Sequence, residues 1–267
     1  MSRPVWLAKP RHLGLATLYW AVILYLTLPL VLMAIMALKD GSYVGLPIRK
    51  WTLKWFSQAL SDGELREAFF YTLRVSLLST LLAVVVGVWT ALVLSRLKGW
   101  RRVALFALAM LPMIVPAIIS AIGLRIFAQS LGLQPGTTSL VVGLATTGVP
   151  FVVVTVSLRL ASLPVSLIEA APDLGCDAFT AFLRITLPWI APAVLAAALF
   201  CMLSGFDDFV RAIFLTGYEK TLPVHLYAKL TSGLSPLVPA IATLLILATL
   251  MVGIVAESVS RRTKGTL

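Results

Sequence analysis

The stretch from Arg159 to Pro188 reads RLASLPVSLIEAAPDLGCDAFTAFLRITLP and separates two long apolar runs. Its first half carries an apolar stripe at helical spacing, with Ser162 and Pro164 placed to start a helix. Gly175 then permits a sharp reversal, and Asp177 can cap a second apolar helix. We therefore expect a helix–turn–helix. Apolar side chains presented in this way, outside the long apolar runs, are typical of a surface that binds a partner.

The rest of the chain consists mainly of long apolar runs. Crossing a bilayer as a helix takes about 20 apolar residues. Runs of this kind extend over Leu13–Leu38, Leu73–Leu94, Val103–Leu124, Ser139–Leu158, Trp189–Phe214 and Pro239–Val259. The composition agrees, because 60% of the 267 residues are hydrophobic and only 12% are charged, against about 25% in soluble proteins. We predict an all-α integral membrane protein with six transmembrane helices, in a single domain over residues 1–267.

The basic residues predict the orientation of these spans. The chain has 22 Lys and Arg against 11 Asp and Glu, a net charge of +11. Cytoplasmic loops of membrane proteins are enriched in Lys and Arg. The residues that share one side are Arg3, Lys9, Arg11, Arg96, Lys98, Arg101, Arg102, Arg159, Arg184, Arg261, Arg262 and Lys264. Both termini and the 159–188 loop are therefore expected in the cytoplasm, and this placement explains the charge without a nucleic-acid partner.

A spaced signature lies within the 159–188 loop. Glu169-Ala170-Ala171, Gly175, Ile185, Leu187 and Pro188 match the pattern EAA-x3-G-x9-I-x-LP in residue type and in spacing. The chain therefore resembles the permease subunits of ATP-binding-cassette (ABC) importers of type I. The resemblance implies that the loop is a coupling helix that docks into a separate ATPase subunit, which Glu169 contacts. Pro172 departs from the pattern, and we expect it to end the first helix early.

Within that family the chain is most similar to the second permease chain of spermidine/putrescine transporters. The segments that carry this similarity are Met113–Pro116, Gly148–Val154, Phe206–Asp208, Leu215–Gly217 and Leu222–Tyr227. The resemblance implies a bacterial inner-membrane location, a related second permease chain, two ATPase subunits that bind ATP with Mg, and an extracytoplasmic solute-binding protein. This chain itself would bind no cofactor. The implied solute is a polyamine or a related small organic solute; an amino-acid derivative, an opine or a metal complex is the alternative.

Four charged residues near the ends of spans are candidates for the solute pathway. Asp207 follows Pro188 by a helix length of roughly 28 Å and so lies near the outer mouth. Asp208 lies beside it, and Arg211 can pair with either acid on one helix face. The two acids either attract a cationic solute or form a neutralised helix end. Arg211 and Arg125, which also lies outward, stand where polyamine permeases usually have aliphatic or small residues, so a zwitterion or an anion remains open.

Prolines inside the runs mark candidate hinges. Pro112 and Pro116 lie in the third run and Pro150 lies in the fourth. Each removes a helix hydrogen bond and permits a kink. Such kinks serve alternating access in a transporter, or are static features of helix packing.

Motifs of catalysis are missing from the sequence. It contains no GxxxxGK[ST] loop to hold nucleotide phosphates, no H-E-x-x-H, no G-x-S-x-G and no spaced Cys/His cluster. We therefore predict a transport subunit without enzymatic activity or a metal site, with ATP hydrolysis on a partner chain. An ion-coupled secondary transporter is the other class considered. It needs a titratable group near the membrane midplane, where the runs hold none, and it has no use for the EAA signature.

Overall fold

The computed structural model describes residues 12–41, 44–45, 47–233 and 235–264. Arg3, Lys9 and Arg11, which contribute to the predicted orientation, lie outside these residues. The described chain is helical, as predicted, and its one β-type contact is an isolated antiparallel bridge between Lys39 and Trp51. It divides into two compact units, residues 1–63 with 226–267 and residues 64–225, and each is described by itself.

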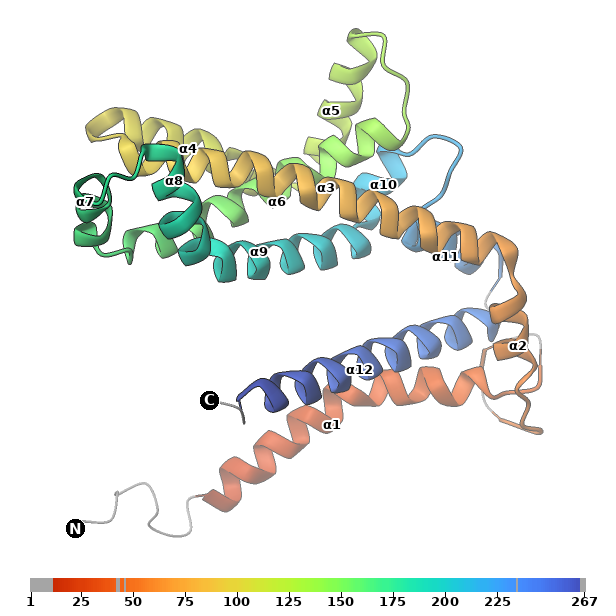
Figure 1. Cartoon of the computed structure of the whole chain (residues 1–267). Coiled ribbons are helices and arrows are strands. Elements are labelled where there is room, and N and C mark those ends of the chain that lie inside the picture. Colours follow the sequence, from red (N-terminus) through yellow and green to blue (C-terminus); the bar gives the residue numbers. More distant parts are fainter. Residues whose placement is uncertain (1–11, 42–43, 46, 234, 265–267) are drawn as a thin grey trace, which may run out of the picture. The chain divides into compact units, whose positions relative to one another are not determined.

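The first unit holds the helices from the two ends of the chain. They are α1 (His12–Ala37), α2 (Lys54–Ser61), the end of α11 (Leu222–Ser232) and α12 (Leu237–Lys264). Helix α1 lies beside α12, and α2 also packs on α12 (Figure 1). After α1, Lys54 binds Asp40 at 2.6 Å and the Trp55 indole donates to the Lys39 carbonyl at 2.9 Å. These contacts hold the loop between α1 and α2 against the start of α2.

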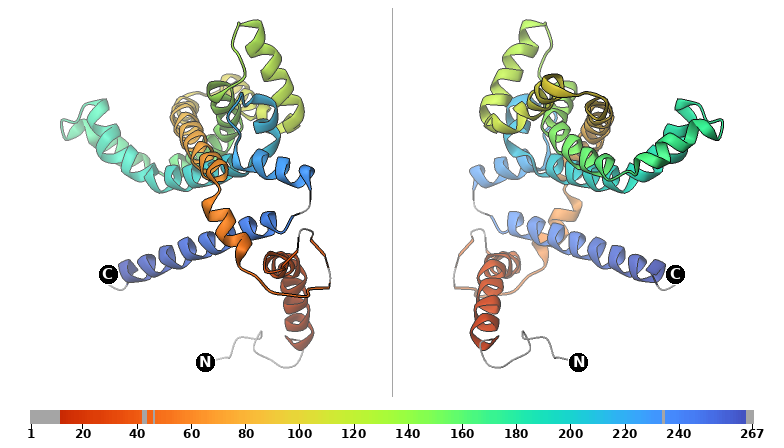
Figure 2. Two further views of the ribbon diagram at one scale, coloured as in Figure 1. Left: turned by 90° about the vertical axis from the view of Figure 1, so that its right-hand side faces the viewer. Right: turned by 90° about the vertical axis from the view of Figure 1, so that its left-hand side faces the viewer.

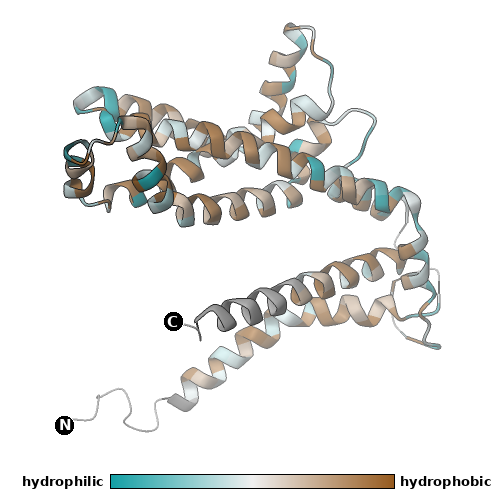
Figure 3. Ribbon diagram, viewed as in Figure 1, coloured by the Kyte–Doolittle hydropathy of each residue, from teal (hydrophilic) through white to brown (hydrophobic). Residues whose placement is uncertain are grey.

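The second unit holds the larger bundle. Its elements are α3 (Gly63–Arg96), α4 (Gly99–Ile114), α5 (Ala117–Ser130), α6 (Thr137–Ala161), α7 (Val165–Asp173), α8 (Ala178–Ala181), the π-helical turn η2 (Phe182–Thr186), α9 (Leu187–Asp207), α10 (Phe209–Leu215) and the start of α11. Apolar residues extend along α3, α6 and α9 (Figure 3). Small residues let these helices approach closely. A Cβ added at Gly87 would lie 2.6 Å from Val152 Cβ, and one added at Gly148 would lie 2.9 Å from Ala83 Cβ.

Several helices are long and apolar enough to cross a membrane. Four qualify among the described residues, Gly14–Ala37, Gly63–Arg96, Thr137–Ala161 and Ala178–Asp207. The pair α4 and α5 qualifies together, although the two helices are bent by 104° at the break. The apolar part of α12, Leu237–Met251, is shorter. The chain is thus an all-helical protein with several candidate membrane-crossing helices.

Two predicted spans are interrupted rather than continuous. The run Val103–Leu124 breaks at Val115, whose φ of −75° and ψ of 126° are extended. The cause is Pro116, which disfavours a helical conformation for the preceding residue. The run Trp189–Phe214 breaks at Asp208, with φ of −72° and ψ of 99°. There the backbone leaves the helical conformation, and the side chain of Asp208 caps the next helix.

Candidate functional site

The 159–188 loop contains a short helix, a turn and then a second helical stretch, which continues through η2 into α9. Helix α7 follows Pro164, and Gly175 reverses the chain with φ of +76°, a left-handed conformation that glycine adopts without strain. The turn is closed by the Gly175 amide, which donates to the Pro172 carbonyl at 2.8 Å, and by the Cys176 amide, which donates to the Ala171 carbonyl at 3.0 Å. Such bonds satisfy the last carbonyls of a helix.

The expectation that Pro172 ends the first helix early is wrong. Helix α7 continues to Asp173, and the Leu174 amide donates to the Ala170 carbonyl at 3.2 Å. Proline removes one amide donor, and at this position the missing bond belongs to the last turn of a short helix, where the remaining bonds suffice.

The second helix of the loop begins at its predicted cap. The Asp177 carboxylate accepts from the amides of Phe179 and Thr180, both at 3.3 Å. Hydrogen bonds from Thr180 hold the pKa of Asp177 below its ordinary value, because they favour the charged carboxylate. After α8 the helix widens at η2, where the Leu187 amide donates to the Phe182 carbonyl. Pro188, which has no amide to donate, follows directly, so the wider turn leads into α9.

Most of the signature residues lie on an exposed and largely apolar surface. Glu169 is exposed on α7, and within the described part of the chain its carboxylate has no ion pair or hydrogen bond. Ala170 is exposed as well, whereas Ala171 is buried and so marks the side of α7 that faces the protein interior. Ile185 is half-buried, and Leu187 and Pro188 are exposed. Large apolar side chains exposed nearby are Val165, Leu167, Ile168, Leu174, Phe179 and Leu183. Figure 2 shows this α7–α8 segment at the far end of α6 and α9 from α10.

Two of the four charged pathway candidates are paired at the break between α9 and α10. The Asp208 carboxylate accepts the Arg211 amide at 2.8 Å and so caps α10. It also binds the guanidinium of Arg211, and both side chains are only 11% exposed. The pair is therefore a buried and neutralised feature of the start of α10.

Arg125 acts at the opposite end of the same short helix. Its guanidinium, on α5, donates to the carbonyl of Phe214 in the last turn of α10 at 2.9 Å. A cation at a helix C-terminus satisfies a free carbonyl and interacts favourably with the helix dipole. Arg125 is thus engaged with α10, and its guanidinium makes no ion pair with either acid.

Asp207 differs from its neighbour. It is exposed, and among the described residues its carboxylate has no ion pair or hydrogen bond. It lines an open hollow of about 650 Å³ together with Phe200, Leu203, Ser204 and Ala117. Ala117 begins α5 directly after the Pro116 break, so the structure brings one predicted hinge beside the predicted pathway.

The other two candidate hinges lie within continuous helices. Pro112 lies in the last turn of α4, and Pro150 is fully buried within α6. Of the three prolines, Pro116 alone stands at a large bend.

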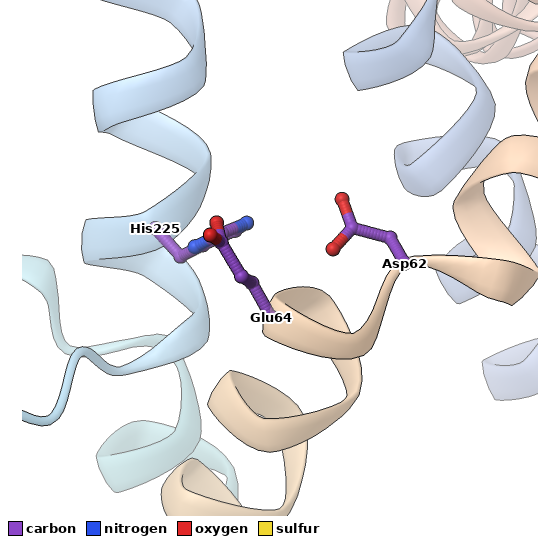
Figure 4. A group of neighbouring side chains, drawn as sticks. All are labelled: Asp62, Glu64 and His225. Carbon is purple, nitrogen blue, oxygen red and sulfur yellow. The ribbon is translucent and has the colours of Figure 1, made fainter.

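A polar pocket at the start of α3 was not predicted. Glu64, Glu67, Tyr71 and Arg74 line it from α3, where they recur every three or four residues and so share one helix face. His225 completes the wall opposite, and its ring lies beside the Glu64 carboxylate (Figure 4). Tyr71 also contacts Thr137, whose hydroxyl donates to Glu219 at 3.2 Å. The helical spacing of the charged residues in α3 was the available signal.

Comparison with known proteins identifies the family. Residues 83–265 match the family described as binding-protein-dependent transport system inner membrane component. The chain belongs to this family. It is 33% identical to the spermidine/putrescine transport system permease protein PotC of Escherichia coli K12, with 92% of this chain and 93% of PotC covered. It is 31% identical to the putrescine transport system permease protein PotI of the same organism, over 77% of this chain and 76% of PotI.

Solved structures share the fold. A bacterial alginate ABC transporter in complex with an alginate-pentasaccharide-bound periplasmic protein matches with a TM-score of 0.71 at 20% identity, over 94% of this chain and 93% of that one. The inward-facing MetNI methionine ABC transporter matches with a TM-score of 0.60 at 19% identity, over 76% and 96%. The predicted family is thereby confirmed. The chain is a multi-pass membrane permease of a binding-protein-dependent transport system, and not an enzyme.

Proposed function

We propose that this chain is the transmembrane subunit of an ATP-driven importer of spermidine, putrescine or a related polyamine. The exposed apolar loop around Glu169 carries the proposal, because a self-sufficient transporter has no need of an unpaired carboxylate on an exposed apolar helix. The near full-length similarity to PotC and PotI supports the class of solute.

In the proposed topology residues 1–267 form one transmembrane domain with six crossings. The crossings are α1, α3, α4 with α5, α6, α9 with α10, and α12, with both termini and the α7–α8 segment in the bacterial cytoplasm. A related second permease chain completes the pathway, and an extracytoplasmic binding protein delivers the solute.

The α7–α8 segment is the coupling element in this proposal. Two partner ATPase subunits bind ATP with Mg, and one docks on the exposed side chains of α7, where Glu169 offers an acceptor to its donors. Ala171 is buried and Gly175 makes the turn. Movement of α7 therefore reaches α9 through η2, Ile185, Leu187 and Pro188. The bend at Pro116 is the hinge that the local geometry favours most.

The solute class is supported by Asp207. A carboxylate that no residue of the described chain neutralises attracts a cation, whereas Asp208 is already neutralised by Arg211. Arg125 and Arg211 are both engaged with α10. Because both arginines bind groups of α10, their presence supports an alternative solute less strongly than the sequence alone suggested. The alternative solutes are an amino-acid derivative, an opine or a metal complex.

A docking experiment tests the coupling role. We expect Glu169→Ala to reduce co-purification of the ATPase subunit and to reduce solute uptake. Asp173→Ala is the matched control, since Asp173 is an exposed acid at the end of the same helix and lies outside the signature. Unchanged co-purification and uptake in Glu169→Ala would show that the segment does not couple transport to the ATPase.

A further inference from the structure

A second pocket lies at the α7 end of the larger bundle. It has a volume of about 660 Å³ and is enclosed by the last turns of α3, the first turn of α4, the end of α6 and the α7–η2 segment. Residues that line it include Arg96, Arg102, Ser157, Cys176, Ile168 and Phe182. The hollow beside Asp207 is lined by the end of α9 and the start of α10, whereas this pocket lies before the start of α9, so the two are separate.

The charge of this pocket is one-sided. Arg96 and Arg102 line it, and none of its lining residues is acidic. Within the described chain neither guanidinium forms an ion pair or a hydrogen bond. Arg159, at the end of α6, is different, because it donates to the Trp189 carbonyl at 2.9 Å and stacks on the Trp189 ring. Arg96 and Arg102 are therefore available to a ligand, and a polyamine would be repelled.

The remaining wall is mostly apolar. Leu163, Ile168 and Phe182 contribute to it, together with alanines of α3, α6 and α8. The hydroxyl of Ser157, a further lining residue, has no hydrogen-bond partner within the described chain. A ligand that suits this pocket combines an anionic group with an apolar body.

We propose that the pocket binds an anionic phospholipid of the cytoplasmic leaflet. Arg96 and Arg102 hold the headgroup phosphate, since guanidinium groups form paired hydrogen bonds with phosphate oxygens. An acyl chain lies along the apolar wall. Basic pockets between transmembrane helices on the cytoplasmic side are suited to such headgroups. Trp100, 76% exposed in the first turn of α4, is of the residue type that is enriched at the membrane–water interface.

The site connects lipid composition to the coupling element, because α7 forms one of its walls through Val165 and Ile168. A bound lipid braces the inner face of α7 and leaves Glu169, which does not line the pocket, free to meet the ATPase. The inference rests on the cytoplasmic orientation in the proposed function. Lipid binding can be measured without transport and without knowledge of which side of the membrane the pocket faces. The lipid site and the proposed function can therefore be contradicted separately.

The test uses the assembled transporter in nanodiscs of phosphatidylcholine, with or without phosphatidylglycerol. Cys176 is partly exposed and lines the pocket, whereas Cys201 is buried. The rate of Cys176 alkylation, located by peptide mapping, therefore reports occupancy. We expect phosphatidylglycerol to slow it about tenfold when the lipid is at about ten times its Kd. Arg96→Gln and Arg102→Gln should each remove most of this protection.

Arg101→Gln is the matched control. It removes the same charge one residue away, but Arg101 lies outside the pocket, over the Trp100 ring. This variant should keep the protection. Equal loss of protection in Arg101→Gln and Arg102→Gln would overturn the proposal in favour of general attraction between charges. Protection by inorganic phosphate in phosphatidylcholine alone would overturn it in favour of a soluble anion, and unchanged alkylation in phosphatidylglycerol would show that no lipid binds.

Discussion

The Asp208 carboxylate binds both the backbone amide and the guanidinium of Arg211, within a single turn at the start of α10. Arg125 binds the Phe214 carbonyl at the other end of α10. This short helix is thus fixed at both termini by charged side chains. The two adjacent acids therefore differ in role, because Asp208 stabilises the start of α10 whereas Asp207 is exposed.

Asp208→Ala should destabilise the protein, because it removes a helix cap and leaves the Arg211 guanidinium buried without its partner. We expect a loss of about 3 kcal/mol, within the range for breaking a buried ion pair. Asp208→Asn keeps the cap and should lose less. Thermal unfolding of the purified transporter in detergent measures both. Equal stability of Asp208→Ala and the wild type would mean that the pair does not stabilise α10.

Asp207→Asn should leave the unfolding temperature unchanged, since its carboxylate has no partner among the described residues. If Asp207 attracts a cation, the variant should transport a polyamine less well and a neutral analogue equally well. Competitive uptake of the two compounds in vesicles measures the difference. An equal reduction for both compounds would remove Asp207 from solute selection.

Gly87→Ala should loosen the contact between α3 and α6. The added Cβ would lie 2.6 Å from Val152 Cβ, and Val152 is fully buried. Overpacking of this kind costs about 1–3 kcal/mol. Gly123→Ala in α5 is the control, because nothing lies within 4 Å of its added Cβ. The unfolding temperature should fall for Gly87→Ala and not for Gly123→Ala. Equal unfolding temperatures of the two variants would show that the close contact at Gly87 is absent.

The sequence was most informative where structure depends on local chemistry. The turn at Gly175, the cap at Asp177 and the exposed apolar face around Glu169 all follow from residue type and spacing, and each is present. Continuous apolar composition was less reliable, because it does not show where a helix breaks. At Pro116 the sequence could not distinguish a kink within one helix from the 104° bend between two helices that the structure has.

Contacts between residues that are distant in the sequence could not be predicted from it. The bond from Arg125 to Phe214 joins α5 to α10, and no pattern within either segment predicts it. The pocket beside Arg102 likewise forms only when α3, α4, α6 and α7 meet. The distribution of basic residues predicts a cytoplasmic position for Arg102, but it does not predict that Arg102 lines a pocket.

Asp177→Ala should weaken the second helix of the loop, since the amides of Phe179 and Thr180 lose their acceptor. Hydrogen exchange at these two amides should be faster in the variant, and Asp177→Asn should restore much of the protection, because asparagine also caps helices.

The pH dependence of this cap has a definite sign. The pKa of Asp177 is lower in the folded state than its ordinary value of 3.8, so the contribution of the charged cap is complete above that value and disappears as the pH falls through the lowered pKa. Between neutral pH and pH 5, cap-dependent protection should therefore stay constant once the exchange rates are corrected for their intrinsic pH dependence. A loss of protection already near pH 6 would mean that another group controls the start of α8.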